Sequence, residues 1–105
     1  MKKTVLVDRR AGKELMKFSR TVQLKFRALF EILEQKGTLE EPFAKKLTGS
    51  KNLFEIRIKD RGQWRALYGY IGSNLIVILS AFYKKTKKTP LSELKKAKKR
   101  RKSYE

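Results

Sequence analysis

The sequence predicts an α+β fold, in which an antiparallel β-meander has helices from the first half of the chain packed on one face. Three observations support this prediction. Apolar residues recur at helical spacing between Ser19 and Gly37, three strand-like runs follow them, and short turn sequences separate those runs. The 105 residues have room for one domain, expected at 1–105, with a basic loop and C-terminal helix at 84–102.

The first third of the chain predicts one strand and two helices. Residues 4–7 form a short β-branched, apolar run that is typical of a strand, and residues 11–18 indicate a short helix. The long helix is the clearest element of the sequence. Ser19 suits its N-cap, and Gly37 suits the left-handed residue that stops a helix.

Residues 38–51 are expected to connect the long helix to the sheet. Pro42 favours one turn there, and we expect that turn to bury Phe43 and Leu47. The meander follows, with strands expected at 53–59, 63–71 and 75–83. The turn sequences Asp60-Arg61-Gly62 and Gly72-Ser73-Asn74 between them suit tight hairpins.

The last part of the chain predicts a basic loop at 84–90 and a helix at 91–102. Ser92 is a candidate cap for this helix, and its thin apolar stripe consists of Leu91, Leu94 and Ala97.

Alternate residues of a strand share a face, so the meander has two predicted faces. The apolar face should lie against the long helix and consists of Phe54, Ile56, Ile58, Trp64, Ala66, Tyr68, Tyr70, Ile76, Ile78 and Phe82. The opposite face is apolar at one end, with Leu67, Val77 and Leu79. At its other end the same face is polar, with Glu55, Arg57, Lys59, Gln63, Arg65 and Tyr83.

Hairpin closure brings two of these polar residues together. If Lys59 lies opposite Gln63, then Arg57 lies opposite Arg65. If Ile71 lies opposite Leu75, Tyr83 falls beside Gln63 and Ala81 beside Arg65.

Two like charges directly opposite each other destabilise a sheet, so the pair Arg57 and Arg65 indicates an anion between them. The guanidinium group binds phosphate through two parallel hydrogen bonds, which makes phosphate the favoured anion. Two other interpretations remain open: both side chains extend into solvent, or Glu55 neutralises one of them. The lysines that follow the last strand favour the phosphate site.

Composition excludes several kinds of chemistry. The chain has no Cys and no His, so disulfides, thiolate nucleophiles, Cys-ligated zinc and His general bases are absent. Acidic residues are not clustered, so we expect neither a metal nor another cofactor. A formal net charge of +18 implies a polyanionic partner, either nucleic acid or an anionic membrane surface, and of these we expect nucleic acid and no membrane. No apolar run is long enough to span a membrane and no secretory signal is present, which predicts a cytoplasmic protein.

Three segments and the order of elements resemble the RelE/HigB-type toxins of bacterial toxin–antitoxin modules, particularly the phage-derived HigB-like branch. The segments are Leu53-Phe54-Glu55-Ile56-Arg57, Trp64-Arg65-Ala66-Leu67-Tyr68 and Ala81-Phe82-Tyr83-Lys84-Lys85-Thr86-Lys87-Lys88-Thr89-Pro90. The resemblance implies a ribosome-dependent mRNA endonuclease, kept inactive by an antitoxin.

The resemblance also implies candidate catalytic residues. The central-strand Arg of the family maps onto Arg65 and the basic residue on the preceding strand onto Arg57, while the family's residues after its last strand map loosely onto Tyr83, Lys84 and Lys85. Some HigB-type relatives use His in the site, which this chain lacks, and RelE-like members often have Lys at the position of Glu55.

Physical chemistry suggests a role for each candidate. Cleavage of RNA by its own 2′-OH needs a base, a group that stabilises the phosphate charge and a proton donor. Arg57 and Arg65 suit the phosphate. Lys84 or Lys85 suits the base, because neighbouring cations favour a neutral amine. Tyr83 could stack on a base or donate a proton. Further contacts with nucleic acid are expected from Lys59, Arg61, Lys87, Lys88, Lys95, Lys98, Lys99, Arg100 and Arg101.

Two alternatives stay open at the level of sequence: a ParE-like inhibitor of DNA gyrase, and a non-catalytic RNA- or DNA-binding protein. For the endonuclease, the expected partners are the ribosome, mRNA and an antitoxin. Because the chain is so basic, we expect the antitoxin to cover the site or displace the last helix with an acidic, helical segment.

Overall fold

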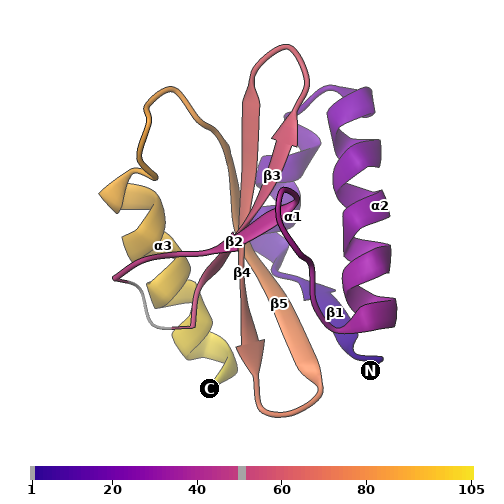
Figure 1. The fold of residues 1–105 in the computed structure, drawn as a ribbon. Coiled ribbons are helices and arrows are strands. Elements are labelled where there is room, and N and C mark those ends of the chain that lie inside the picture. Colours follow the sequence, from indigo (N-terminus) through magenta and orange to yellow (C-terminus); the bar gives the residue numbers. More distant parts are fainter. Residues whose placement is uncertain (1, 50–51) are drawn as a thin grey trace.

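The computed structural model describes residues 2–49 and 52–105 and confirms the predicted α+β fold. Its elements are β1 (Thr4–Val7), α1 (Arg9–Met16), α2 (Arg20–Lys36), β2 (Ala44–Lys46), β3 (Phe54–Lys59), β4 (Gln63–Ile71), β5 (Leu75–Tyr83), α3 (Leu91–Arg101) and a 3₁₀ turn (Lys102–Tyr104). Figure 1 shows the sheet between two helical layers, with α1 and α2 on one side and α3 on the other.

The sheet has the order β1-β5-β4-β3-β2, and the predicted meander β3-β4-β5 forms its centre. Both outer strands pair in ways that the sequence did not indicate. β1 runs parallel to β5, and β2, a strand missed by the sequence analysis, pairs antiparallel with β3.

One face of the sheet carries the main core, which α1 and α2 cover. Val22, Phe26, Leu29 and Leu33 of α2 are buried against the meander. The predicted ends of α2 are confirmed, because the Ser19 hydroxyl accepts a hydrogen bond from the N–H of Val22 and Gly37 adopts a left-handed conformation with φ of 78°.

The other face is covered over only part of its length. Leu53, Leu67, Val77, Leu79 and Phe82 form a second core there, which Ala97 and Leu94 of α3 close. The polar end of the same face, which the sequence analysis identified, lies outside this second core and forms the candidate site described below.

The register of β3 and β4 follows the prediction, with Lys59 opposite Gln63 and Arg57 opposite Arg65. The pairing of β4 with β5 starts as predicted at Ile71 and Leu75 but shifts by one residue at a β-bulge between Leu67 and Tyr68.

The bulge overturns three predicted positions. Arg65 lies opposite Phe82 instead of Ala81, and Tyr83 lies opposite Trp64 instead of Gln63. Because a shift of one residue exchanges the faces of a strand, Phe82 packs in the second core and not against α2.

Four other expectations are wrong. The side chain of Phe43 is exposed, although Leu47 is partly buried as expected. Leu91 is also exposed, so the apolar stripe of α3 consists of Leu94 and Ala97. Helix α1 begins at Arg9, before the predicted start, because Asp8 caps it, whereas Pro90 and not Ser92 precedes α3.

Arginines and one tyrosine hold α3 and the C-terminal turn in place. The guanidinium group of Arg100 donates to both carboxylate oxygens of Glu14, at 2.9 and 3.0 Å, and to the carbonyl of Leu79 at 2.9 Å. Arg101 donates to the carbonyl of Tyr70 at 2.6 Å and fits over Gly69, where a Cβ would lie 2.2 Å from its Nη1.

Asp8 connects the two ends of the chain. Its carboxylate accepts hydrogen bonds from the N–H groups of Arg10 and Ala11, the guanidinium of Arg10 and the hydroxyl of Tyr104 at 2.7 Å. Within residues 2–49 and 52–105, none of the helices has the length and apolar character needed to cross a membrane.

We expect Asp8→Ala to lower the free energy of unfolding by about 1–3 kcal/mol at neutral pH, through loss of the helix cap and of the Tyr104 hydrogen bond. Burial raises the pKa of Asp8, but its hydrogen bonds with Arg10, Tyr104 and the first turn of α1 outweigh this and hold the pKa well below 3.8. The stabilisation is therefore complete above the ordinary pKa and is lost as the pH falls through the lower folded-state pKa.

Urea denaturation of the wild type, Asp8→Ala and Asp8→Asn as a function of pH measures this effect. Asn still caps a helix, so Asp8→Asn should lose less stability and should lack this acid-dependent contribution. Equal stability of the wild type and Asp8→Ala at neutral pH would contradict the assignment.

Candidate nucleic-acid site

The candidate site is centred on two arginines at the polar end of the sheet. Arg57 of β3 and Arg65 of β4 lie directly opposite each other and therefore share a face. The side chain of Arg57 is 35% exposed, whereas that of Arg65 is 8% exposed. The guanidinium group of Arg57 is thus accessible from solvent, whereas that of Arg65 is almost completely buried.

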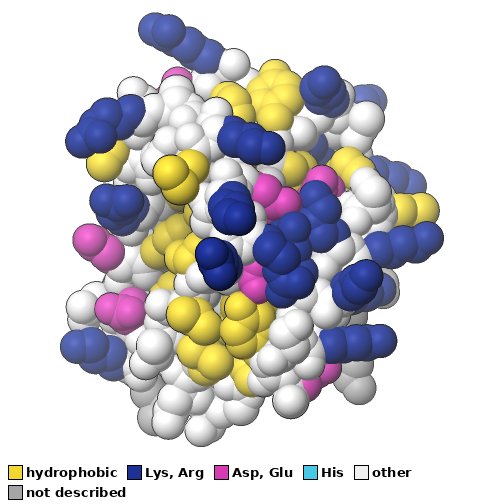
Figure 2. All heavy atoms as spheres, turned by 180° about the vertical axis from the view of Figure 1, so that it is seen from behind, with side chains coloured by type: hydrophobic (Ala, Val, Ile, Leu, Met, Phe, Trp, Pro, Cys, Tyr) yellow, Lys and Arg dark blue, Asp and Glu magenta, His cyan; other side chains and the backbone are white. Residues whose placement is uncertain are grey.

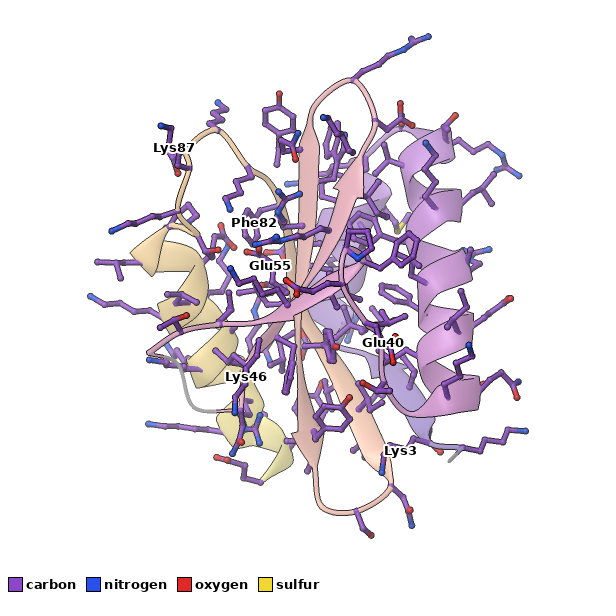
Figure 3. The ribbon with its side chains drawn as sticks, viewed as in Figure 1. Lys3, Glu40, Lys46, Glu55, Phe82 and Lys87 are labelled. Carbon is purple, nitrogen blue, oxygen red and sulfur yellow. The ribbon has the colours of Figure 1, made fainter. Side chains whose placement is uncertain are left out.

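A buried carboxylate lies between the two arginines. Oε1 of Glu55 is 3.2 Å from Nε of Arg57 and 3.5 Å from Nε of Arg65, and the Glu55 side chain is 1% exposed. Its other oxygen, Oε2, accepts a hydrogen bond from the hydroxyl of Thr89 in the 84–90 loop. Figure 3 shows Glu55 in the middle of the molecule, on the side of the sheet that faces this loop and α3.

This arrangement modifies the interpretation of Glu55. Neutralisation of one arginine by Glu55 was one of the possibilities predicted from the sequence, and the structure shows that Glu55 contacts both arginines. Since two guanidinium groups share one carboxylate, the trio keeps a positive charge that an added anion can compensate. The site therefore remains suited to phosphate.

Arg65 is held by several contacts. Its Nη1 donates to the carbonyl of Trp64 and its Nη2 to Oε1 of Gln63, both at 3.0 Å. Burial lowers the pKa of Arg65, the nearby Arg57 lowers it further, and Glu55 opposes the shift. These contacts fix the guanidinium plane before any ligand binds, which reduces the entropy lost on binding.

Lys84 extends the cationic site beyond the arginines. Its N–H donates to the carbonyl of Gln63 at 2.7 Å, which fixes the start of the 84–90 loop beside β4. Burial lowers the pKa of Lys84; Arg65, Arg57 and Lys45 lower it further, while Glu55 raises it. This half-buried amine is thus easier to deprotonate than an ordinary lysine.

Tyr83 does not join this group. The β-bulge places it opposite Trp64, and the two rings pack edge to face with centroids 4.8 Å apart. The prediction that Tyr83 shares the face of Arg57 and Arg65 is therefore wrong. Its neighbour Lys85 is exposed at the start of the loop.

The other predicted nucleic-acid contacts fall into two groups. Lys59, Arg61, Lys87, Lys88, Lys95, Lys98 and Lys99 are exposed. Arg100 and Arg101 instead direct their guanidinium groups to Glu14, Leu79 and Tyr70, so they hold α3 and are not available as simple phosphate contacts. Figure 2 shows that basic side chains far outnumber acidic ones on the face drawn there.

A pocket of about 640 Å³ adjoins the arginines at the edge of β3. Leu29 of α2 and Ile58 of β3 contribute apolar surface, and Phe43 lines it from the turn before β2. Acidic, Cys and His side chains form no group of three that could hold a metal ion in the part of the chain that the structure describes.

Sequence reasoning missed Lys45, Thr89 and Phe43 as members of this region. Lys45 lies opposite Glu55 in β2, a strand of three residues without a recognisable pattern. Thr89 is part of the quoted loop motif, but its contact with Glu55 joins residues 34 positions apart. The only local signal for Phe43 was its position after Pro42, which favoured the wrong prediction of burial.

These features define a small, basic α+β domain in which two opposed arginines share one carboxylate at the uncovered end of the sheet. Residues 13–102 match the family described as phage-derived protein Gp49-like. The chain belongs to this family, and the resemblance to RelE/HigB-type toxins stated from the sequence is confirmed. No curated protein matches the chain in sequence.

Solved structures of RelE proteins share the fold. A double mutant of the E. coli toxin RelE in the free state is similar with a TM-score of 0.73 and 24% identity, covering 95% of this chain and 98% of that one. The intact E. coli RelBE toxin–antitoxin complex gives 0.63 and 26%, covering 80% and 99%. The archaeal RelE–RelB complex from Pyrococcus horikoshii gives 0.62 and 25%, covering 79% and 96%.

We expect Glu55→Gln to lower the free energy of unfolding by about 3 kcal/mol, because it leaves Arg65 buried without its anionic partner. Urea denaturation measures the loss. Glu31→Gln is the matched control, since it removes the same charge from an exposed position on α2 and should change stability by less than about 0.5 kcal/mol. Equal unfolding curves for the two variants would contradict a structural role of the Glu55 carboxylate.

Proposed function

We propose that this protein is the toxin of a toxin–antitoxin module and acts as a ribosome-dependent mRNA endonuclease. The observation that carries the proposal is the juxtaposition of Arg57, Arg65 and Lys84 at the uncovered end of the sheet. Family membership and similarity to RelE structures support the toxin class.

The first requirement of the reaction is stabilisation of the phosphate. Attack of a 2′-OH on the neighbouring phosphorus adds negative charge to the phosphate oxygens. Arg57 is accessible and Arg65 is already fixed by Gln63 and Trp64, so both can donate to these oxygens without rearranging first. Preorganised donors of this kind usually provide the largest share of catalysis.

The second requirement is proton transfer. We assign the base to Lys84 and not to Lys85, because Lys84 is half-buried beside the arginines whereas Lys85 is exposed. The neutral amine of Lys84 accepts the proton of the 2′-OH. Lys85 is then the remaining candidate of the predicted set to protonate the 5′ oxygen, since Tyr83 faces Trp64 on the other side of the sheet.

The third requirement is alignment of the RNA. A lysine is a weak base at neutral pH, so much of the rate must come from holding the 2′-OH in line with the bond that breaks. We assign this alignment to the ribosome. In this proposal the exposed lysines of the 84–90 loop and of α3 contact ribosomal RNA through its phosphates, and we propose a cytoplasmic location because the ribosome is the target.

The proposed partner that controls the toxin is an antitoxin with an acidic, helical segment. Two similar structures are toxin–antitoxin complexes, RelBE of E. coli and RelE–RelB of P. horikoshii. Carboxylates of such a segment could pair with Arg57 and Lys84 and thereby exclude phosphate.

Primer extension on a translated message tests the proposed activity. We expect the wild type to produce cuts in phase with codons, and Arg65→Ala and Arg57→Ala to reduce them by at least 100-fold, since each removes a donor to the transition state. Arg20→Ala, at an exposed position at the start of α2, is the matched control and should cut normally.

Circular dichroism establishes that each variant is folded, and co-expression with the acidic partner from the neighbouring reading frame should suppress the cuts. An intact message together with gyrase-linked DNA breaks would instead support a ParE-like inhibitor. Salt-sensitive binding of RNA without either effect would support a non-catalytic binding protein.

The pH dependence of cleavage tests the role of Lys84. Its amine must be neutral to accept a proton, so the rate of the chemical step should rise with pH until the lowered pKa of Lys84, below 10.5, is reached. Lys84→Met should reduce that rate by at least 100-fold and flatten its pH dependence. Single-turnover cleavage on programmed ribosomes measures both; an unchanged pH profile in Lys84→Met would overturn the assignment.

A further inference from the structure

The turn before β2 presents an aromatic side chain beside the arginine site. Phe43 is 52% exposed, although burial of such a ring is normally favourable. Its carbonyl accepts a hydrogen bond from the N–H of Arg57 at 2.8 Å, so the turn is fixed to the strand that carries the arginine. This hydrogen bond fixes the backbone of Phe43 relative to Arg57.

Phe43 and both arginines line the same pocket of about 640 Å³. Leu29 from α2 and Pro42 from the turn add apolar walls, and the side chain of Gln63 adds a polar group. The pocket lies beside the start of β2, since Pro42 and Phe43 come directly before Ala44, the first residue of that strand. Its volume lies in the range of small-molecule sites.

The charges around the pocket indicate what it can hold. Of the lining cations, Lys25 pairs with Asp60 at 3.2 Å, Arg57 and Arg65 share Glu55, and Lys59 is exposed. The remaining positive charge lies at the arginines and Lys59, where a phosphate can bind, whereas the rest of the pocket is lined by the apolar residues Ala28, Leu29, Pro42, Phe43 and Ile58. A flat, neutral and largely apolar group suits these walls better than an acidic peptide.

We propose that this pocket binds the base of an unpaired RNA nucleotide next to the phosphate held by Arg57 and Arg65, with the ring of Phe43 as its stacking surface. The proposal rests on the proposed function, because it needs the arginines to hold RNA phosphate. An aromatic ring beside a phosphate-binding group is the usual arrangement for binding single-stranded nucleic acid with little sequence preference.

Equilibrium binding of a short single-stranded 2′-O-methyl RNA tests the proposal, since this RNA lacks the hydroxyl needed for cleavage. Fluorescence anisotropy should show that Phe43→Ala weakens binding by at least about 5-fold, the loss expected for one stacked base. Phe43→Trp should bind like the wild type. The slope of affinity against salt should stay unchanged in Phe43→Ala, because no phosphate contact is lost.

Met16→Ala is the matched control, because Met16 is a 74% exposed apolar side chain on α1 outside this pocket. A second probe removes one base from the RNA at a time. At the position that occupies the pocket, loss of the base should weaken binding to the wild type but not weaken it further in Phe43→Ala.

Two outcomes would overturn the proposal: unchanged RNA affinity in Phe43→Ala, or an equal further loss when the base is removed from RNA bound to that variant. Weakened binding of an acidic partner peptide with unchanged RNA binding would assign the pocket to the partner. Because this RNA cannot be cleaved, the binding measurement does not depend on whether the protein is an endonuclease. Failure of that function would appear as an uncut message with wild-type protein.

Discussion

The carboxylate of Glu55 is the constraint on which the candidate site depends. Two arginines directly opposite each other in a sheet repel, and burial of one of them adds a desolvation penalty. Glu55 offsets both effects because it contacts Arg57 and Arg65 from the same strand face. Through Thr89 it also fixes the end of the loop that begins at Lys84. One buried charge thereby sets the relative positions of two strands and a loop that are distant in sequence.

Because α3 covers only part of its face of the sheet, a ligand can approach Arg57 and Arg65 only from the uncovered end. Helix α3 closes the second core over Leu67, Val77 and Leu79, and it leaves the opposite end of that face without a helix. The β-bulge affects which residues lie next to the arginines, because it turns Phe82 toward this core and Tyr83 toward Trp64. Without the extra residue in β5, a tyrosine would stand beside the arginines and a phenylalanine would point toward α2.

Local patterns predicted what local interactions determine. The 3.6-residue period and the residues Ser19 and Gly37 placed α2, and the turn between β3 and β4 fixed the register that pairs Arg57 with Arg65. The sequence pattern does not indicate the bulge, because residues on both faces of β5 are apolar. Either alternation of inward and outward residues along β5 is therefore compatible with a buried strand. The parallel pairing of β1, the strand β2 and the contact of Thr89 with Glu55 are all non-local. The sequence therefore predicted that Arg57 and Arg65 lie opposite each other, but not the residues that surround them.

The basic C-terminal segment shows how residue type separates structural from exposed cations. Within Lys98-Lys99-Arg100-Arg101, both arginines turn inward and both lysines are exposed. The planar guanidinium group satisfies several carbonyl and carboxylate oxygens at once, whereas the ammonium group of lysine is more strongly hydrated. Arg100 therefore exchanges its hydrogen bonds with water for hydrogen bonds with the carboxylate of Glu14 and the carbonyl of Leu79. The ammonium groups of the exposed lysines keep their bound water. This segment of four consecutive basic residues thus combines two functions. Its arginines hold α3 over the second core, and its lysines supply the long-range electrostatic field that attracts a polyanion.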